Sequence, residues 1–405
     1  MILLILKYEL KKIFSKKLNQ VILTAAFLLA VVFSIFAIQS IRFVDTQGVL
    51  HEGTLTAARR LASDQNQWKG TLTTDKIAKA VKSRKELDEK YPEDIPDTAF
   101  GETIQSYSNI TDFVINIMTP DSPGDKSVLH QLTDEQVGQL YNIYKDNMLK
   151  MSVEYGETPE QKELLMKQYE KIQMPLTYEA PVSWDTMILY AETYEMVLAI
   201  VIGFLTAGIF TEEFRNRAES VFYSTKYGRS KATKNKILAG ILSTTIVYWT
   251  GIGILTLISF TVMGTSGMHT PYQLMFPYSI YPMTFGQYYL LILICGYIAS
   301  LLTASTAMLT TAKMHTPYVA VCLPFFMLCV LPFFARALPS FAAFFNLMPC
   351  VLTNILNCAR IPILYQVGNT VFRQIPLAML IYTAASILLL PFVYRCYSQY
   401  GLKKE

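Results

Sequence analysis

Side chains that often carry chemistry are present, but they do not stand at the spacings that catalysis or metal binding needs. The four histidines form no His-Glu-x-x-His or similar group, and no serine lies in a Gly-x-Ser-x-Gly turn. The six cysteines match neither the zinc nor the thiol-redox spacings. The sequence therefore predicts no catalytic residue and no metal site, so we do not expect an enzyme.

Phosphate binding also lacks its usual motif. No Gly-x-x-x-x-Gly-Lys-Ser/Thr sequence occurs, and the nearest pattern, at residues 228–231, lacks the first glycine and a preceding strand. We therefore expect the chain to bind no cofactor of its own and to hydrolyse no ATP by that chemistry. The net charge of +4 is too small to indicate a nucleic-acid partner.

Two carboxylates, Glu192 and Glu195, stand just before an apolar run at residues 196–210. As a helix this run measures about 22 Å, which is shorter than the ~30 Å hydrocarbon core of a bilayer. A membrane-crossing helix must therefore extend past Glu195. The two carboxylates could then line the outer mouth of a translocation pathway. The simpler interpretation, which we favour, places them at the lipid headgroups.

The elements that would position such residues are long apolar helices. The chain is 52% hydrophobic and only 16% charged, whereas soluble domains carry about 25% charged residues. Six apolar runs are long enough to cross a bilayer. They are residues 21–41, 187–210, 237–262, 288–311, 317–334 and 376–394. The sequence predicts an all-α membrane protein with six transmembrane helices, the first of which is an uncleaved anchor.

The orientation of these helices follows from their flanking lysines and arginines. Basic residues gather before the first span, between the second and third, between the fourth and fifth, and after the sixth. An even number of spans places all of these segments on one side, which the positive-inside rule makes the cytoplasm. We therefore expect a multi-pass protein of the cell membrane with both termini cytoplasmic, including a tail at 395–405.

The polar stretch at 42–186 is then extracellular and long enough to be a domain. Its helix signals are a capping box formed by Thr133 and Gln136, and Thr158 followed by Pro159. Residues 75–91 read as a further helix. We predict a mainly helical domain whose many carboxylates are most simply a solvated face. A ligand-capturing or partner-docking role is the sharper alternative.

Two cytoplasmic segments combine apolar and basic residues. Residues 1–20 place five lysines opposite an apolar face, which indicates an amphipathic helix at the membrane surface, although a plain topogenic flank is the alternative. In the loop at 211–236, Phe214, Val221 and Phe222 have the spacing of one helix face. Gly228 can end that helix, and Lys231, Lys234 and Lys236 would then anchor the next span at the headgroups. An ordinary positive-inside loop is the alternative here.

This loop resembles the first cytoplasmic loop of the ABC-2-type permeases, the membrane-spanning subunits of bacterial ATP-binding-cassette exporters. Phe210 and Glu213 match the phenylalanine and glutamate that open that loop. Residues 227–230 look like its turn, and Lys236 looks like its closing lysine. The chain departs from the pattern at residues 218–220, where a Gly-Thr pair is usual.

The resemblance extends to the layout of an elbow helix at 1–20, six spans and an outer segment at 337–375. In such permeases the last segment forms short re-entrant helices. Here Pro339, Pro349 and Asn354 interrupt the apolar run at 338–356, which fits that description. Cys350 and Cys358 fall in the same segment, and the sequence leaves open whether they pair.

The resemblance implies the permease subunit of an ATP-driven exporter for an amphiphilic substrate, such as a peptide antibiotic, a drug or a lipid-like molecule. It also implies separate ABC-type ATPase subunits that bind the ATP and magnesium, and a second permease copy or paralogue. The coupling residues would be Glu212, Glu213, Phe214, Phe222, Tyr227, Gly228 and Arg229. The main alternative is a membrane-anchored sensor that binds a ligand through its extracellular domain. An intramembrane enzyme or a secondary transporter is disfavoured, because the first lacks a catalytic constellation and the second a visible repeat.

Overall fold

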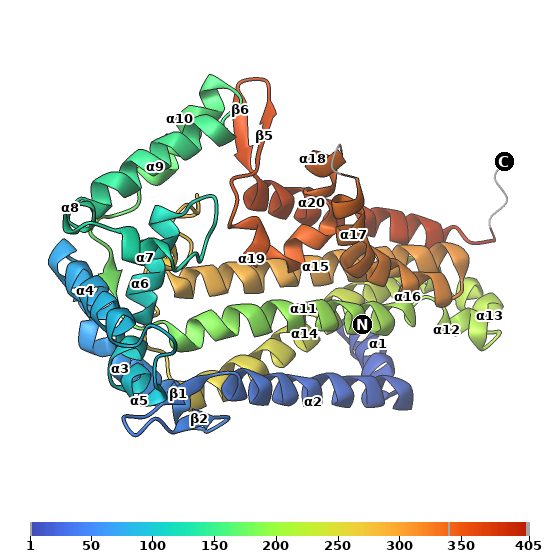
Figure 1. Ribbon diagram of the computed structural model, residues 1–405. Coiled ribbons are helices and arrows are strands. Elements are labelled where there is room, and N and C mark those ends of the chain that lie inside the picture. Colours follow the sequence, from blue (N-terminus) through green and yellow to red (C-terminus); the bar gives the residue numbers. More distant parts are fainter. Residues whose placement is uncertain (1, 339–340, 402–405) are drawn as a thin grey trace.

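The computed structural model describes residues 2–338 and 341–401, which are mostly helical. Pro339 in the predicted re-entrant segment and residues 402–405 of the predicted tail lie outside this part. Figure 1 shows a bundle of long helices that is preceded by the N-terminal helix α1. These helices are α1 (Ile2–Ser15), α2 (Lys17–Gln39), α11 (Val182–Ala207), α14 (Thr233–Met263), α15 (Phe285–Met314) and α20 (Gln374–Ser398).

Five helices in the described part are long and apolar enough to cross a membrane by length and composition. They are α2, α11, α14 with the turn before it, α15 and α20. These helices indicate a multi-pass membrane protein. The prediction of a mainly helical membrane protein is therefore confirmed. The predicted span at 317–334 is a shorter apolar helix, and its first part, α16 (Tyr318–Phe325), contains Pro324. It continues through the π-helix η5 (Phe326–Val330) into α17 (Leu331–Ala337).

Polar side chains join the long helices across their apolar contacts. The hydroxyl of Tyr194 on α11 donates to the carbonyl of Ala26 on α2 at 3.0 Å. Ser34 on α2 donates to the carbonyl of Leu255 on α14 at 3.3 Å. Hydrogen bonds of this kind stabilise helix association where no water competes for the partners.

Residues 42–181 form a second unit of short helices at one end of the bundle (Figure 1). The predicted domain boundary at 186 is therefore late, because α11 already begins at Val182. The elements of the unit are β1 (Arg42–Val44), β2 (Leu50–Glu52), α3 (Ala57–Gln65), η1 (Asn66–Trp68), β3 (Gly70–Thr71), α4 (Thr74–Lys90), α5 (Asp97–Ala99), η2 (Phe100–Ile104), α6 (Gln105–Met118), α7 (Val128–Gln131), α8 (Asp134–Gly138), α9 (Leu140–Tyr155), α10 (Pro159–Tyr169) and β4 (Thr177–Tyr178). β1 pairs with β2 and β3 with β4, both antiparallel.

The predicted helix starts in this unit are confirmed. The Thr133 hydroxyl accepts from the Gln136 N–H at 3.2 Å and the Gln136 side chain accepts from the Thr133 N–H at 2.9 Å, which is a complete capping box. Thr158 caps α10 in the same way, with Pro159 in the first turn. The single helix predicted after Thr133 is instead two helices, α8 and α9, because α8 ends at Gly138, a poor helix former.

The 42–181 unit is fixed firmly to the bundle. The Tyr144 hydroxyl on α9 donates to the Pro277 carbonyl at 2.6 Å, and the Tyr278 hydroxyl donates to the Ile117 carbonyl at 2.7 Å. Pro277 and Tyr278 lie in the connection between α14 and α15, residues 264–284, which contains η4 (Tyr272–Leu274). One continuous apolar core runs from these short helices into the bundle. The unit is therefore not a loosely tethered appendage.

The predicted re-entrant segment at 337–375 consists of short elements. They are α18 (Ala342–Phe345), η7 (Pro349–Thr353), α19 (Ile355–Cys358), and the antiparallel hairpin of β5 (Leu364–Val367) and β6 (Thr370–Arg373). Cys350 and Cys358 are buried and free, so they form no disulfide in this structure.

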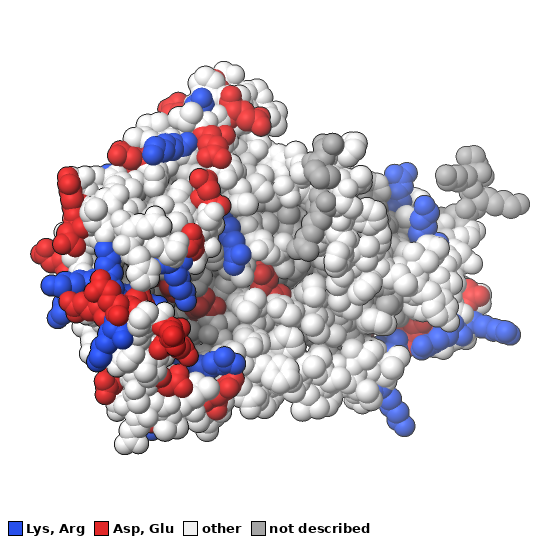
Figure 2. Space-filling view, viewed as in Figure 1, with Lys and Arg blue, Asp and Glu red and all other residues white. Residues whose placement is uncertain are grey.

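Charged residues gather at the two ends of the molecule. On the face shown in Figure 2 they cover the 42–181 unit and the opposite end near α12 and α13, with a mostly uncharged band between them. Large apolar side chains on the long helices, including Leu28, Leu257 and Leu388, are exposed. Such a band is the surface that lipid requires.

Candidate functional site

The loop at 211–236 lies at the end of the bundle opposite the 42–181 unit, near α1 and the last turns of α20 (Figure 1). It consists of α12 (Glu212–Arg215), α13 (Glu219–Ser224) and the π-helix η3 (Gly228–Ala232), which continues into α14. The single amphipathic helix predicted here is therefore wrong.

The break between α12 and α13 has a defined geometry. Arg217 adopts a left-handed backbone conformation with φ 54°. Its N–H donates to the Phe214 carbonyl at 3.2 Å, and the next N–H, of Ala218, donates to the Glu213 carbonyl at 2.8 Å. This pair of bonds is a Schellman motif, which ends α12 and turns the chain. Arginine stands where glycine is usual, so this turn could not be predicted from the residue type.

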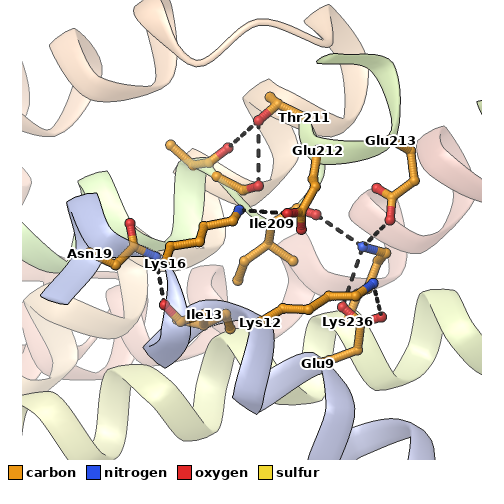
Figure 3. Close-up of polar contacts among 12 residues, drawn as sticks. Glu9, Lys12, Ile13, Lys16, Asn19, Ile209, Thr211, Glu212, Glu213 and Lys236 are labelled. Atoms are coloured by element: carbon orange, nitrogen blue, oxygen red, sulfur yellow. Dashed lines mark hydrogen bonds and ion pairs between the residues drawn. The ribbon is translucent and has the colours of Figure 1, made fainter. Parts of the chain in front are cut away.

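Lys236 is the centre of the site. Its side chain is 0% exposed, and its ammonium nitrogen lies 2.7 Å from Glu213 Oε1 and 3.4 Å from Glu9 Oε2 (Figure 3). It also donates to the Ile209 carbonyl at 3.1 Å. These three partners use all three N–H donors of the ammonium. The predicted headgroup anchor at Lys236 is therefore wrong, because the side chain points into the protein.

Further contacts extend this cluster to four helices. Lys12 pairs with Glu9 at 3.1 Å within α1, and Lys16 pairs with Glu212 at 3.2 Å. The hydroxyl of Tyr397 on α20 donates to Glu213 Oε2 at 2.9 Å. We call this set the ion-pair cluster, and its members are Glu9, Lys12, Lys16, Glu212, Glu213, Lys236 and Tyr397. It joins α1, α12, α14 and α20.

The charges of the cluster support one another. Burial raises the pKa of Glu213, but attraction to the Lys236 ammonium and hydrogen bonds from Lys236 and Tyr397 outweigh it, so the pKa lies below its ordinary value. Burial lowers the pKa of Lys12, but the attraction of the neighbouring Glu9 carboxylate and its hydrogen bond outweigh this effect, so the pKa lies above its ordinary value. These shifts favour the carboxylate form of Glu213 and the ammonium form of Lys12.

The predicted coupling residues Phe214 and Phe222 pack inside the loop. The Phe214 ring stacks on His315 with centroids 3.9 Å apart, and the Phe222 ring lies 5.7 Å from the Tyr397 ring. Both phenylalanines are only partly exposed, whereas Val221 is 66% exposed. The phenylalanines therefore hold the loop, and Val221 is the apolar side chain that it presents.

Tyr227, Gly228 and Arg229 make the turn into α14. Gly228 does not end a helix, as was predicted, but begins η3. Arg229 donates to the carbonyls of Ser398 at 2.8 Å and Tyr400 at 2.7 Å, which satisfies the C-terminal end of α20. The ammonium of Lys231 lies 4.5 Å from the centre of the Tyr227 ring.

Glu192 and Glu195 lie apart from this cluster, inside the bundle. Glu192 is 8% exposed and Glu195 is 0% exposed, so the headgroup placement favoured from the sequence is wrong. Glu192 Oε1 accepts from the N–H of Leu356 at 2.9 Å, at the beginning of α19, where helix N–H groups lack internal partners. Glu195 lies beside the Tyr248 hydroxyl at 2.8 Å.

Sequence reasoning missed two members of the ion-pair cluster, Glu9 and Tyr397. Glu9 had a visible signal, since it is the single acidic residue among the first twenty, in a segment with five lysines. Tyr397 had none, because a tyrosine near the end of an apolar helix is ordinary in membrane proteins.

No family model matches the chain, and comparisons with curated proteins and with solved structures found no match. The fold and the cluster define a multi-pass helical membrane protein whose first helix, 211–236 loop and long helices are joined at one end by buried ion pairs.

Proposed function

We propose that this chain is the permease subunit of an ATP-driven exporter of an amphiphilic substrate, energised by separate ABC-type ATPase subunits. The observation that supports this most is the buried Lys236, which ties the 211–236 loop to α1 and α14. A force on the loop must reach these helices, because the loop cannot move away without leaving buried charges unpaired. An ATPase that binds the loop could therefore move α1 and α14 when it changes conformation.

The exposed side of the loop suits a protein partner. Val221 is exposed on α13, and Arg215, Arg217 and Lys226 of the same loop are exposed as well. An exposed apolar side chain on a basic loop favours an apolar pocket with acidic edges on the partner. The ATP and magnesium belong to that partner, and the permease pairs with a second copy or a paralogue.

The proposal includes a full topology. Residues 317–334 are the additional span, which brings the total to six and places both termini in the cytoplasm. The 42–181 unit is then outside, and the ion-pair cluster lies at the cytoplasmic end. The uncharged band of Figure 2 lies in the bilayer.

Single cysteines at the two ends of the molecule test this topology. In a variant without native cysteines, Lys150→Cys is expected to react with a membrane-impermeant maleimide in intact cells. Lys226→Cys is expected to react only after the cells are permeabilised. Both positions are exposed in the structure, so burial does not protect either one. Equal labelling of both positions in intact cells would contradict the topology.

The partner surface is tested by placing a charge on its apolar centre. Val221→Asp is expected to reduce co-purification of an ATPase with a phosphate-binding loop, expressed from the neighbouring reading frame, by about tenfold or more, the effect of losing an interface hot spot. Val153→Asp is the matched control, since Val153 is equally exposed but lies on α9 in the 42–181 unit. Unchanged co-purification of Val221→Asp would remove the loop as the docking surface, and failure of any such ATPase to bind the wild type would favour the sensor.

The sensor is kept as a second candidate because of a pocket of about 480 Å³ between α9 and α10. Met148, Met166 and Met174 line it, and Lys145 and Glu170 lie at the same pocket. Methionine adapts to apolar ligands of different shape. A ligand bound there would contact only the 42–181 unit, as a sensor requires.

A further inference from the structure

Glu195 lies in the middle of α11, and its side chain is 0% exposed. No lysine, arginine or histidine whose side chain the structure describes forms an ion pair with it. The titratable groups around it are one carboxyl group, two phenols and a thiol. They are Glu192 on α11, Tyr248 on α14, and Tyr289 and Cys295 on α15. A carboxylate in such surroundings is costly.

The hydrogen bonds of Tyr248 decide where the proton is. The Tyr248 hydroxyl oxygen lies 2.6 Å from the Leu293 carbonyl oxygen and 2.8 Å from Glu195 Oε1. A phenol has one hydrogen to donate, and a carbonyl can only accept. At 2.6 Å the hydrogen must lie between Tyr248 and Leu293, because two bare oxygens would repel each other at that distance. The second contact then needs a hydrogen from Glu195.

The other oxygen of Glu195 agrees with a neutral acid. Oε2 has no hydrogen-bond partner among the residues that the structure describes, and it rests against Gly296 on α15, where a Cβ would lie 2.2 Å from it. In a carboxylate, Oε2 would carry about half of the negative charge. It would face Gly296, which offers it no hydrogen-bond donor, so its desolvation would be costly. The carbonyl oxygen of a neutral carboxylic acid carries much less of that cost.

We propose that Glu195 is a proton-binding site. The hydrogen bonds from Glu195 to Tyr248 and from Tyr248 to Leu293 then join α11, α14 and α15 only when the proton is bound. Loss of the proton would leave a bare charge or turn Tyr248 away from Leu293. A rearrangement that opens Glu195 to water therefore releases the proton, and closure takes it up again. This site does not depend on ATPase coupling.

Infrared difference spectroscopy of the purified protein at neutral pH tests the proposal. Glu195→Gln is expected to lose the carbonyl-stretch band of one neutral carboxylic acid relative to the wild type. The glutamine amide keeps a donor for Tyr248, so this variant retains the contact and the fold. Glu192→Gln is the control and is expected to retain the band assigned to Glu195.

A second variant separates protonation from simple burial. Tyr248→Phe removes the acceptor of the Glu195 proton, so the band is expected to shift in frequency. An unchanged spectrum in Glu195→Gln would overturn the proposal, because Glu195 would then be ionised. A band that is lost in Glu195→Gln but is unmoved by Tyr248→Phe would overturn the proposed proton chain.

Discussion

Replacing Lys236 by methionine is expected to free the 211–236 loop from the bundle and, in the permease that we propose, to abolish ATP-driven transport. The substitution keeps the length of the side chain but removes the ammonium that lies 2.7 Å from Glu213 and 3.4 Å from Glu9. Removing one partner from a buried ion pair costs about 3–5 kcal/mol, because the charge left behind is uncompensated. Thermal unfolding in detergent measures the loss of stability, proteolytic cleavage after Arg217 measures the release of the loop, and export of substrate measures the loss of transport.

Lys234→Met is the control for this substitution. Lys234 is on the same helix and two residues away, but it is exposed, and its ammonium lies 5.6 Å from the centre of the Tyr394 ring. The double variant Lys236→Met with Glu213→Gln is expected to recover part of the lost stability, because it removes a positive and a negative charge together. Equal stability of Lys236→Met and Lys234→Met would show that the ion-pair cluster does not hold the loop.

The features that the sequence predicted well are those set by neighbouring residues. An apolar run of twenty residues has few alternatives to a membrane helix, so α2, α14, α15 and α20 are found where expected within a few residues. The caps at Thr133 and Thr158 depend on residues three positions away. Neither kind of feature requires knowledge of the tertiary fold.

The ion-pair cluster could not be predicted, because its partners are far apart in the chain. Glu9 and Lys236 are separated by 227 positions. In the sequence, Lys236 and Lys234 are equivalent basic residues before an apolar run. Only the packing of α1 against α14 decides that Lys236 faces inward and Lys234 faces outward.

The carboxylates of α11 show the same limit in another form. The short apolar run after Glu195 correctly required α11 to continue past it, which it does. The sequence could not show that Gly296 leaves space for the carboxyl or that Tyr248 meets it. Both partners come from other helices, so the headgroup placement was the simplest interpretation and it was wrong.

Phe214 and Phe222 were identified as important residues, but their orientation was not predicted. A helical spacing assigned them to one face together with Val221, whereas the turn at Arg217 separates Phe214 from the other two. The two rings face Tyr397 and its neighbours, and Val221 alone faces solvent. A short turn therefore divides one expected surface into an internal support and an external contact.

Gly228→Ala is expected to disrupt the turn from the loop into α14 and, in the permease that we propose, to uncouple transport from ATP hydrolysis. An alanine Cβ at this position would lie 2.0 Å from the Phe222 carbonyl oxygen and 2.7 Å from Thr225 Oγ1. The Thr225 hydroxyl could turn away, but the backbone oxygen of Phe222 can move only if α13 moves. Overpacking of this kind costs about 1–3 kcal/mol. The ratio of substrate exported to ATP hydrolysed measures the effect.

Gly253→Ala gives the matched control, because Gly253 lies inside α14 with no atom within 4 Å of an added Cβ. Alanine is favoured over glycine in a helix by about 1 kcal/mol, so this variant is expected to be at least as stable as the wild type. Coupling at the wild-type ratio in Gly228→Ala would mean that α13 can shift freely. The loop would then not be the rigid link between the ATPase and α14, because a link that transmits force cannot also yield to a single methyl group.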